Sequence, residues 1–259
     1  MHKRRLIILL LCILANFSLG YGYQRPEAIS EKDWKSIQPY LLPEDSPAKP
    51  ILDKIFGKTR VTTNISSFRD AGFIFEERQG RKRLIAKHPK LKGYFVKTYL
   101  DMHDLREKDW NIWKHRIDGA KQIQTCIDTH GYNHIMKVPK KWLYPLPEKP
   151  AGKGPSIKTC VLVAEDMHIL DNKKNKKKYK TAIDKERLDA LYVVLKKNKL
   201  FDSIHIFNIP FSKDGKIAFI DTEHFNVTHR PVVYKRMTKR FPSDLQDYWL
   251  KITRRRLAG

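Results

Sequence analysis

The chain has 259 residues, of which 52 are basic and 28 are acidic, and its formal net charge at pH 7 is +24. This length supports one large domain or two small ones. With three cysteines the chain is not a disulfide scaffold, so a hydrophobic core must carry its stability. A surface this basic attracts polyanions such as nucleic acid, anionic lipid or acidic protein.

Residues 1–22 predict a secretory signal peptide. A basic start (His2 to Arg5) is followed by an apolar stretch from Leu6 to about Leu19 and by small residues before Tyr23. The apolar stretch is shorter than the roughly 20 residues that span a bilayer, and an uncleaved N-terminal anchor is the alternative. We therefore expect an exported protein, secreted or periplasmic, with no membrane span after cleavage.

The mature chain would keep two cysteines, Cys126 and Cys160. They form either one bridge or two buried thiols. Because the chain is long enough to bury a sizeable core, we expect that folding does not require a bond between them.

Residues 23–67 predict an N-terminal extension with short helices at 31–40 and 51–57, joined by a proline-rich link. The next part, residues 68–164, is predicted to be rich in strands, the clearest being Tyr94 to Tyr99. Within it, apolar residues three and four positions apart predict a long helix over 104–129. Two more strands follow, and the second ends at Glu165 and Asp166.

Residues 165–259 are predicted to be mainly helical. The run of charges at 171–180 indicates a solvated loop, and an amphipathic helix is expected over 184–197. A short strand is predicted to start at Asn208, and the apolar run 217–220 ends on Asp221. A last helix is expected over 243–256. The order of elements predicts an α+β fold.

Lys97 lies in the middle of an apolar strand, where a lysine either reaches the edge of the sheet or serves a buried anion. A hairpin precedes this strand, and a long helix, two strands, another helix and the Asp221 strand follow. This order resembles the protein-kinase-like superfamily in a degenerate, pseudokinase-like form, over roughly residues 68–225. The resemblance implies a β-rich N-terminal lobe with one long helix, and a shortened helical C-terminal lobe.

The resemblance also implies ATP and Mg²⁺ as cofactors. Lys97 would bind the phosphates, the hinge at Glu165 and Met167 would read adenine through its backbone, and Asn208 and Asp221 would bind the metal. We therefore expect Lys97, Asn208 and Asp221 to converge on one cleft between the two parts of the chain.

Other features depart from the kinase pattern. The sequence has no H-R-D motif, and Ser203 stands where the catalytic aspartate belongs, which leaves the adjacent Asp202 as a weak candidate. The helix acid that pairs with Lys97 would be Glu107 or Asp118. The sequence thus favours a pseudoenzyme or a weak atypical phosphotransferase over an efficient kinase.

Two further interpretations remain open. The chain could be a basic exported binding protein for a polyanion or a protein partner, with no nucleotide site and no specific nucleic-acid motif. Its basic residues cluster at 173–180 and 235–240. Alternatively, His205, His224 and His229 lie near Asp221 in the sequence and could form a transition-metal site with it.

Overall fold

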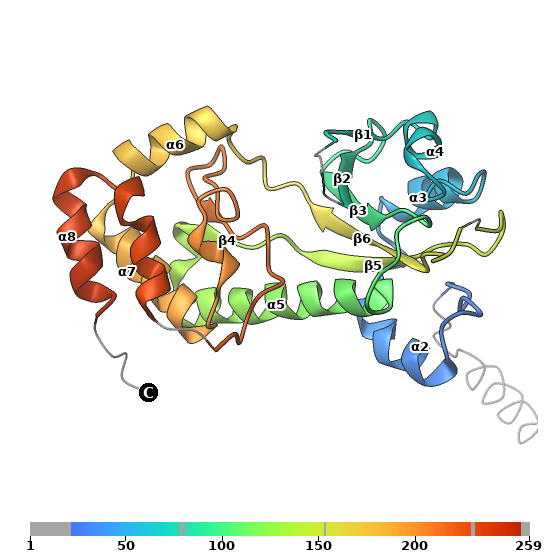
Figure 1. Ribbon diagram of the computed structural model, residues 1–259, viewed down its shortest axis with the longest axis horizontal. Helices are drawn as coiled ribbons and strands as arrows, with labels where there is room; N and C mark the ends of the chain where they lie inside the picture. The colour runs from blue at the N-terminus through green and yellow to red at the C-terminus, as the bar shows by residue number, and fades with distance from the viewer. Residues whose placement is uncertain (1–21, 78–79, 81, 153, 229–230, 255–259) are drawn as a thin grey trace, which may run out of the picture.

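A computed structural model describes residues 22–77, 80, 82–152, 154–228 and 231–254, and its elements form an α+β fold (Figure 1). The predicted signal peptide lies almost wholly outside the described residues. The described part contains no helix that is long and apolar enough to cross a membrane.

The main sheet has five antiparallel strands in the order β1-β2-β3-β6-β5. The strands are β1 (Ile74–Phe75), β2 (Arg83–Lys87), β3 (Tyr94–Tyr99), β5 (Lys141–Pro145) and β6 (Cys160–Glu165). A second, parallel sheet pairs β4 (Met136–Lys137) with β7 (Ile217–Ala218). The predicted strand at 94–99 is confirmed as β3, and the final strand is shorter than expected.

Short helices precede the sheet: α2 (Glu31–Ile37), the 3₁₀ helix η1 (Gln38–Tyr40), α3 (Lys49–Phe56) and α4 (Ile65–Asp70). The first two together confirm the helix expected over 31–40. The α4 helix was not predicted, because its six residues are too few to show a period. The Asn64 side chain caps α4 by accepting from the N–H of Ser67 at 2.9 Å.

The long helix α5 (Asp109–Thr129) starts five residues later than the predicted boundary at 104. Its first residue explains the difference, because the buried Asp109 carboxylate accepts from the N–H groups of Thr159 and Cys160, each at 2.8 Å. These bonds fix the start of α5 to the beginning of β6 and the residue before it. Between α5 and β4 lies the 3₁₀ helix η2 (Tyr132–His134).

Helix α5 passes through two separate hydrophobic clusters. Its first half places Trp113 and Ile117 against the sheet, beside Leu143 and Leu162. The second half contributes to a larger core built with the C-terminal helices. Figure 1 shows α5 running from beneath the sheet to the helices at the other end of the molecule.

The prediction of a solvated loop at 171–180 is wrong, because these residues form the helix α6 (Asn172–Thr181). Asp171 caps it by accepting from the N–H of Lys174 at 2.8 Å. Asn175 and Tyr179, one turn apart, are buried and donate to the carbonyl oxygens of Ile206 and Ile209. Two polar anchors therefore hold α6 in place, while its lysines point to solvent.

The remaining elements are α7 (Lys185–Lys197), the 3₁₀ helices η3 (Asp202–Ile204) and η4 (Pro231–Arg240), and α8 (Ser243–Ile252). The helix predicted over 184–197 is confirmed, with Asp184 as its cap. The last predicted helix ends at Ile252 rather than 256. Asn208 lies in a turn and does not start a strand, because its N–H donates back to the carbonyl of His205 at 2.8 Å.

Cys126 and Cys160 are both free thiols, which settles the open choice in favour of two buried thiols. We expect a reducing agent to leave the thermal unfolding midpoint unchanged, because no disulfide constrains the unfolded chain. Differential scanning calorimetry with and without the reductant tests this. A loss on reduction comparable to the roughly 2–5 kcal/mol of a native disulfide would contradict it.

Candidate functional site

Six charged side chains from five parts of the chain meet beneath the sheet, and we call them the buried charge cluster. The six are Arg83 on β2, Lys97 on β3, Arg116 on α5, Lys141 on β5, and Asp221 and Glu223 after β7.

The register of the sheet places three of the cations on one face. Lys97 pairs with Leu162 of β6, and Leu162 pairs in turn with Leu143 of β5, so these side chains share a face. Lys141 is two residues from Leu143, and Arg83 is two residues from the partner of Lys97 on β2, so both point the same way. Leu143 and Leu162 pack against α5. The three cations therefore face the helix that carries Arg116.

The two lysines hold the segment around Asp221 against the sheet. Lys97 Nζ donates to the carbonyl of Ile220 at 3.3 Å, and Lys141 Nζ donates to the Thr222 hydroxyl at 2.6 Å. The Thr222 hydroxyl donates to the carbonyl of Arg116 on α5. Strands β3 and β5 and helix α5 are thus all hydrogen-bonded to one short segment, residues 220–223.

The arginines bind the carboxylates directly. Arg116 Nη1 lies 2.7 Å from Asp221 Oδ1, and its Nη2 bonds to Glu223. Arg83 lies 3.5 Å from Asp221 and 3.6 Å from Glu223. The Arg116 side chain is only 2% exposed, whereas the Glu223 side chain is 31% exposed. The cluster is therefore closed on the α5 side and reaches solvent near Glu223.

Burial and mutual repulsion perturb the titration of these groups. Burial lowers the pKa of Lys97 to about 7, despite the nearby Asp221 carboxylate. The pKa of Lys141 is also far below its ordinary value, first because of burial and then because of Lys97. For Asp221, burial acts upward, but Arg116, Arg83 and the two lysines outweigh it and hold the pKa well below its ordinary value. The cluster thus keeps Asp221 ionised at neutral pH, whereas burial disfavours the charged form of both lysines.

The two parts of the predicted site behave differently. Lys97 reaches the segment that contains Asp221. Its hydrogen bond to the carbonyl of Ile220 joins two residues that are 123 positions apart in the sequence. The backbone carbonyl of Asn208 accepts from the N–H of Ile220 at 3.0 Å, so Asn208 also lies beside this segment. The buried Ser203 hydroxyl lies 3.5 Å from the carbonyl of Asp221. Asp202 belongs to η3, and its side chain is outside the described structure.

The expected hinge residues lie at the end of β6. The Glu165 carboxylate accepts a hydrogen bond from the backbone N–H of Lys140 at 2.9 Å. The backbone N–H of Glu165 donates to the Lys140 carbonyl at 3.0 Å. Met167 is half-buried in the loop that follows. The backbone N–H of Glu165 is therefore already hydrogen-bonded to the residue that precedes β5, and is not free to bind adenine.

Neither helix acid proposed as the partner of Lys97 pairs with it. The Glu107 carboxylate accepts from the side chain of Asn111 at 2.7 Å, and the Asp118 carboxylate pairs with Lys114 at 3.1 Å. At the point facing the cluster α5 supplies Arg116 instead. The charge that this helix contributes is thus opposite to the one that the kinase resemblance implied.

The side chains do not fit a magnesium site as they lie. Both oxygens of Asp221 face guanidinium groups, and Lys97 and Lys141 stand close enough to add repulsion toward a cation. Within the described residues, no three His, Cys, Asp or Glu side chains gather closely enough to hold a metal, although His229 is outside that set. An anion fits better, since Arg116 Nε is a buried donor with no partner among the described residues.

Three members of the cluster were missed from the sequence: Arg83, Arg116 and Lys141. Arg116 had a readable signal, because it lies three residues after Trp113 and four before Ala120, within the apolar face of the predicted helix. A charged residue inside such a face must find a partner. Which face of the sheet Arg83 and Lys141 lie on depends on the strand register, and the register could not be predicted from the sequence.

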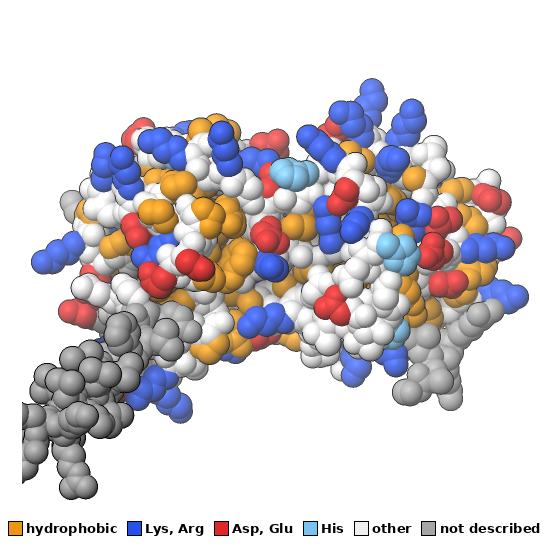
Figure 2. Space-filling view, turned by 180° about the vertical axis from the view of Figure 1, so that it is seen from behind, with side chains coloured by type: hydrophobic (Ala, Val, Ile, Leu, Met, Phe, Trp, Pro, Cys, Tyr) orange, Lys and Arg blue, Asp and Glu red, His pale blue; other side chains and the backbone are white. Residues whose placement is uncertain are grey.

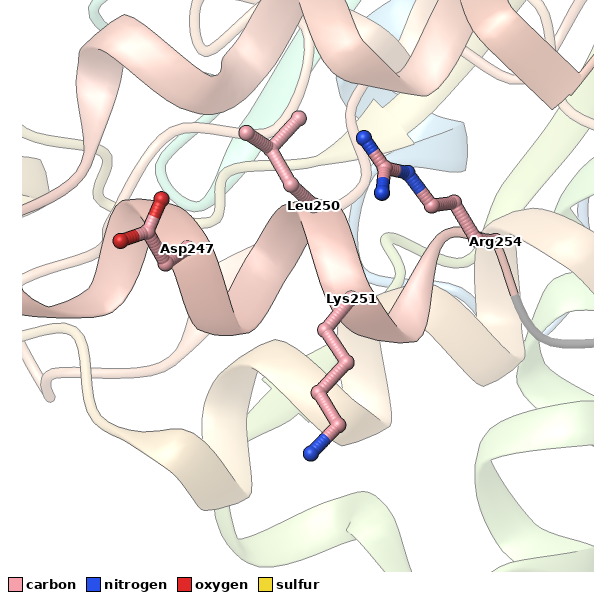
Figure 3. A pocket seen from close by; sticks show the side chains of 4 residues that line it. All are labelled: Asp247, Leu250, Lys251 and Arg254. Carbon is pink, nitrogen blue, oxygen red and sulfur yellow. The ribbon is translucent and has the colours of Figure 1, made fainter.

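A separate depression lies along α8 at the C-terminal end (Figure 3). The described residues that line it are Asp247, Leu250, Lys251 and Arg254. All four come from α8 and the turn after it, and Figure 3 shows their side chains spread apart. The depression does not bring groups from different elements together, so the buried charge cluster is the better candidate site.

No protein-family model matches this chain, and no curated protein sequence is significantly similar to it. Function is therefore inferred from the chemistry of the buried charge cluster.

At Gly119, helix α5 lies directly against the Asp221 segment. A Cβ atom at this position would lie 2.0 Å from the carbonyl oxygen of Thr222 and 2.8 Å from the ring of Phe225. Alanine normally favours a helix over glycine by about 1 kcal/mol. Here Gly119→Ala should instead destabilise the fold by about 1–3 kcal/mol, because the segment must move away from α5.

Urea unfolding measures this loss, with Thr125→Ala as the control at an exposed position of the same helix. The control should change the free energy of unfolding by less than about 0.5 kcal/mol. A Gly119→Ala variant as stable as the natural chain would show that the contact is not tight in solution.

The low pKa of Lys97 predicts a pH-dependent stability. Between its folded value of about 7 and the ordinary value of 10.5, the unfolded chain binds a proton that the folded chain does not. Stability should therefore rise with pH in this window, by at most about 1.4 kcal/mol per pH unit from this group, and the effect should be absent below it.

Lys97→Met should remove the part of this rise that Lys97 contributes and leave the part from Lys141, whereas Lys177→Met on the exposed face of α6 should retain the whole rise. Urea unfolding at pH 7, 8 and 9 tests the difference. Parallel pH profiles for the two variants would mean that Lys97 titrates as an ordinary exposed lysine.

Proposed function

We propose that this chain is an exported nucleotide-binding protein with a degenerate kinase-like fold, and that it is a pseudoenzyme rather than an efficient kinase. The observation that carries the proposal is the meeting of Lys97 and the Asp221 segment across 123 residues of chain. The five-stranded antiparallel sheet followed by the helical C-terminal part supports the same reading.

The charges of the cluster favour the phosphates as the bound part of a nucleotide. Two guanidinium groups pair with the two carboxylates, and the two lysines have no carboxylate within 4.0 Å among the described residues. Lys97 makes one hydrogen bond there, to a carbonyl, although an ammonium group has three donors. A phosphate anion would supply the missing negative charge and accept those hydrogen bonds.

The same geometry argues against efficient phosphoryl transfer. A kinase places a catalytic aspartate beside the acceptor hydroxyl and uses a free aspartate to bind magnesium. Here Ser203 stands near Asp221, and Arg116 and Arg83 occupy the Asp221 carboxylate. Binding would therefore depend on the fixed cations and not on a divalent metal.

We expect ATP to raise the thermal unfolding midpoint equally well with EDTA and with Mg²⁺. At a hundred times the dissociation constant, a single site stabilises the fold by about 2.7 kcal/mol. Lys97→Met should lower the affinity for ATP at least tenfold, because it removes a cation from the phosphate site. Differential scanning fluorimetry over a range of ATP concentrations measures both effects.

Lys177→Met is the matched control, since it removes the same charge from the surface helix α6 and should not change the affinity. Equal losses in the two variants would indicate nonspecific attraction to a basic surface. Equal stabilisation by inorganic tripolyphosphate would show that phosphates alone are recognised, and the nucleotide part of the proposal would fail.

A second candidate, a basic exported protein that binds a polyanion or another protein, is favoured by a different part of the molecule. Its basis is the basic surface of the C-terminal part, which lies apart from the buried charge cluster.

A further inference from the structure

The C-terminal part carries exposed basic side chains on the neighbouring elements α6 and η4, and we call them the basic surface. Its members are Lys173, Lys174, Lys176, Lys177, Lys178, Lys235, Arg236, Lys239 and Arg240, all of them exposed. Figure 2 shows Lys and Arg side chains gathered at the end of the molecule where α6 lies.

The two elements are joined into one surface by Lys180. Its Nζ donates to the carbonyl oxygens of Lys239 and Phe241, each at 2.8 Å. These bonds tie the C-terminal end of α6 to the end of η4, with Tyr179 and Phe241 packed beneath. The basic side chains of both elements therefore belong to one rigid surface.

Almost none of this charge is neutralised by the protein. Among the described residues, Lys174 is the only member within 4.0 Å of a carboxylate, that of Asp171 at 3.3 Å. The buried face of α6 consists of Asn175 and Tyr179, so its lysines cover the whole of the remaining arc. In Figure 1, α6 lies along the outer edge of the molecule with no other element above it.

Apolar side chains lie beside the charges. Phe207 is 42% exposed, and Lys176 Nζ lies 5.7 Å from the centre of its ring. Ile169, just before α6, is 37% exposed. A cluster of exposed lysines with an exposed aromatic ring at its edge is the composition of a surface that is attracted to an anionic bilayer.

We propose that the basic surface binds the anionic phospholipid surface of a membrane, with α6 parallel to the bilayer and Phe207 at the level of the head groups. Lysine suits this partner because it acts as a point charge and needs no oriented acceptor. A nucleic acid duplex is read by an element that enters a groove and by bidentate arginines, whereas α6 has no arginine and the two arginines of the surface, Arg236 and Arg240, lie on η4. This inference is independent of the nucleotide site.

Vesicle cosedimentation tests the proposal, with vesicles of phosphatidylcholine alone and of phosphatidylcholine with 30% phosphatidylserine. The measured quantity is the ratio of the two partition coefficients, which cancels any binding of apolar segments to neutral lipid. We expect strong preference for the anionic vesicles at low salt and its loss at high salt. Each basic residue near an anionic surface contributes about a fivefold gain in binding.

The triple variant K173Q/K176Q/K177Q should therefore lower this ratio on the order of 100-fold. Its matched control is K32Q/K54Q/K58Q, which removes three exposed lysines from α2, α3 and the turn after α3, none of them within 4.0 Å of a carboxylate among the described residues. The control should lower the ratio less than fivefold. Phe207→Ser should reduce binding to anionic vesicles severalfold without changing the charge.

Equal losses in the two triple variants would overturn the proposal, since the net charge and not this surface would then drive binding. Equal partition into neutral and anionic vesicles would overturn it as well. So would a duplex DNA that binds more tightly than the vesicles at equal phosphate concentration and loses its binding in the α6 variant, because the surface would then belong to nucleic acid. Unchanged circular dichroism and unfolding midpoints establish that each variant is folded.

Discussion

Helix α5 belongs to two hydrophobic clusters, and the rest of the structure depends on the point where it passes from one to the other. Its first half packs on the sheet, and its second half packs in the C-terminal core. Arg116 and Gly119 lie at the junction. Arg116 forms an ion pair with Asp221, and Gly119, which has no side chain, allows the backbone of Thr222 to lie directly against the helix. The sheet, the helix and the C-terminal part are therefore held together at one place.

The charges at this junction explain why the site is better suited to anions than to metals. In a protein interior, a carboxylate is tolerated when cations and hydrogen bonds surround it. Asp221 and Glu223 satisfy this condition with Arg116 and Arg83, and the two sheet lysines are left with only carbonyl and hydroxyl partners. The desolvation that these lysines suffer lowers their pKa values, and an anion that entered would raise them again. Ligand binding would thus be coupled to uptake of protons.

Much of the fold could be predicted from the sequence, and the errors have identifiable causes. The strand at 94–99 is rich in aromatic and β-branched residues, the helix at 185–197 repeats apolar residues every three or four positions, and both are confirmed. The helix α6 was taken for a loop because its lysine-rich composition concealed the two buried residues, Asn175 and Tyr179, that anchor it. Turn chemistry, not hydrophobic period, decides the conformation at Asn208.

The candidate site could be predicted only in part, for a similar reason. Lys97 and Asp221 stand out because each is a charge at the end or in the middle of an apolar strand. Their partners come from β2, β5 and α5, and only the strand register and the rotation of α5 bring those side chains to the same place. Pairings of this range cannot be read from local patterns, so the sign of the charge that α5 contributes was missed.

The contact at Gly119 also limits how the molecule can move. A helix that carries bulky residues at such a point can roll or slide past its neighbour by exchanging side-chain packing, but here backbone lies against backbone. The Thr222 hydroxyl bonded to the carbonyl of Arg116 blocks sliding along the helix axis as well. Helix α5 and the segment after β7 are therefore locked to each other at this point, so one cannot shift without the other.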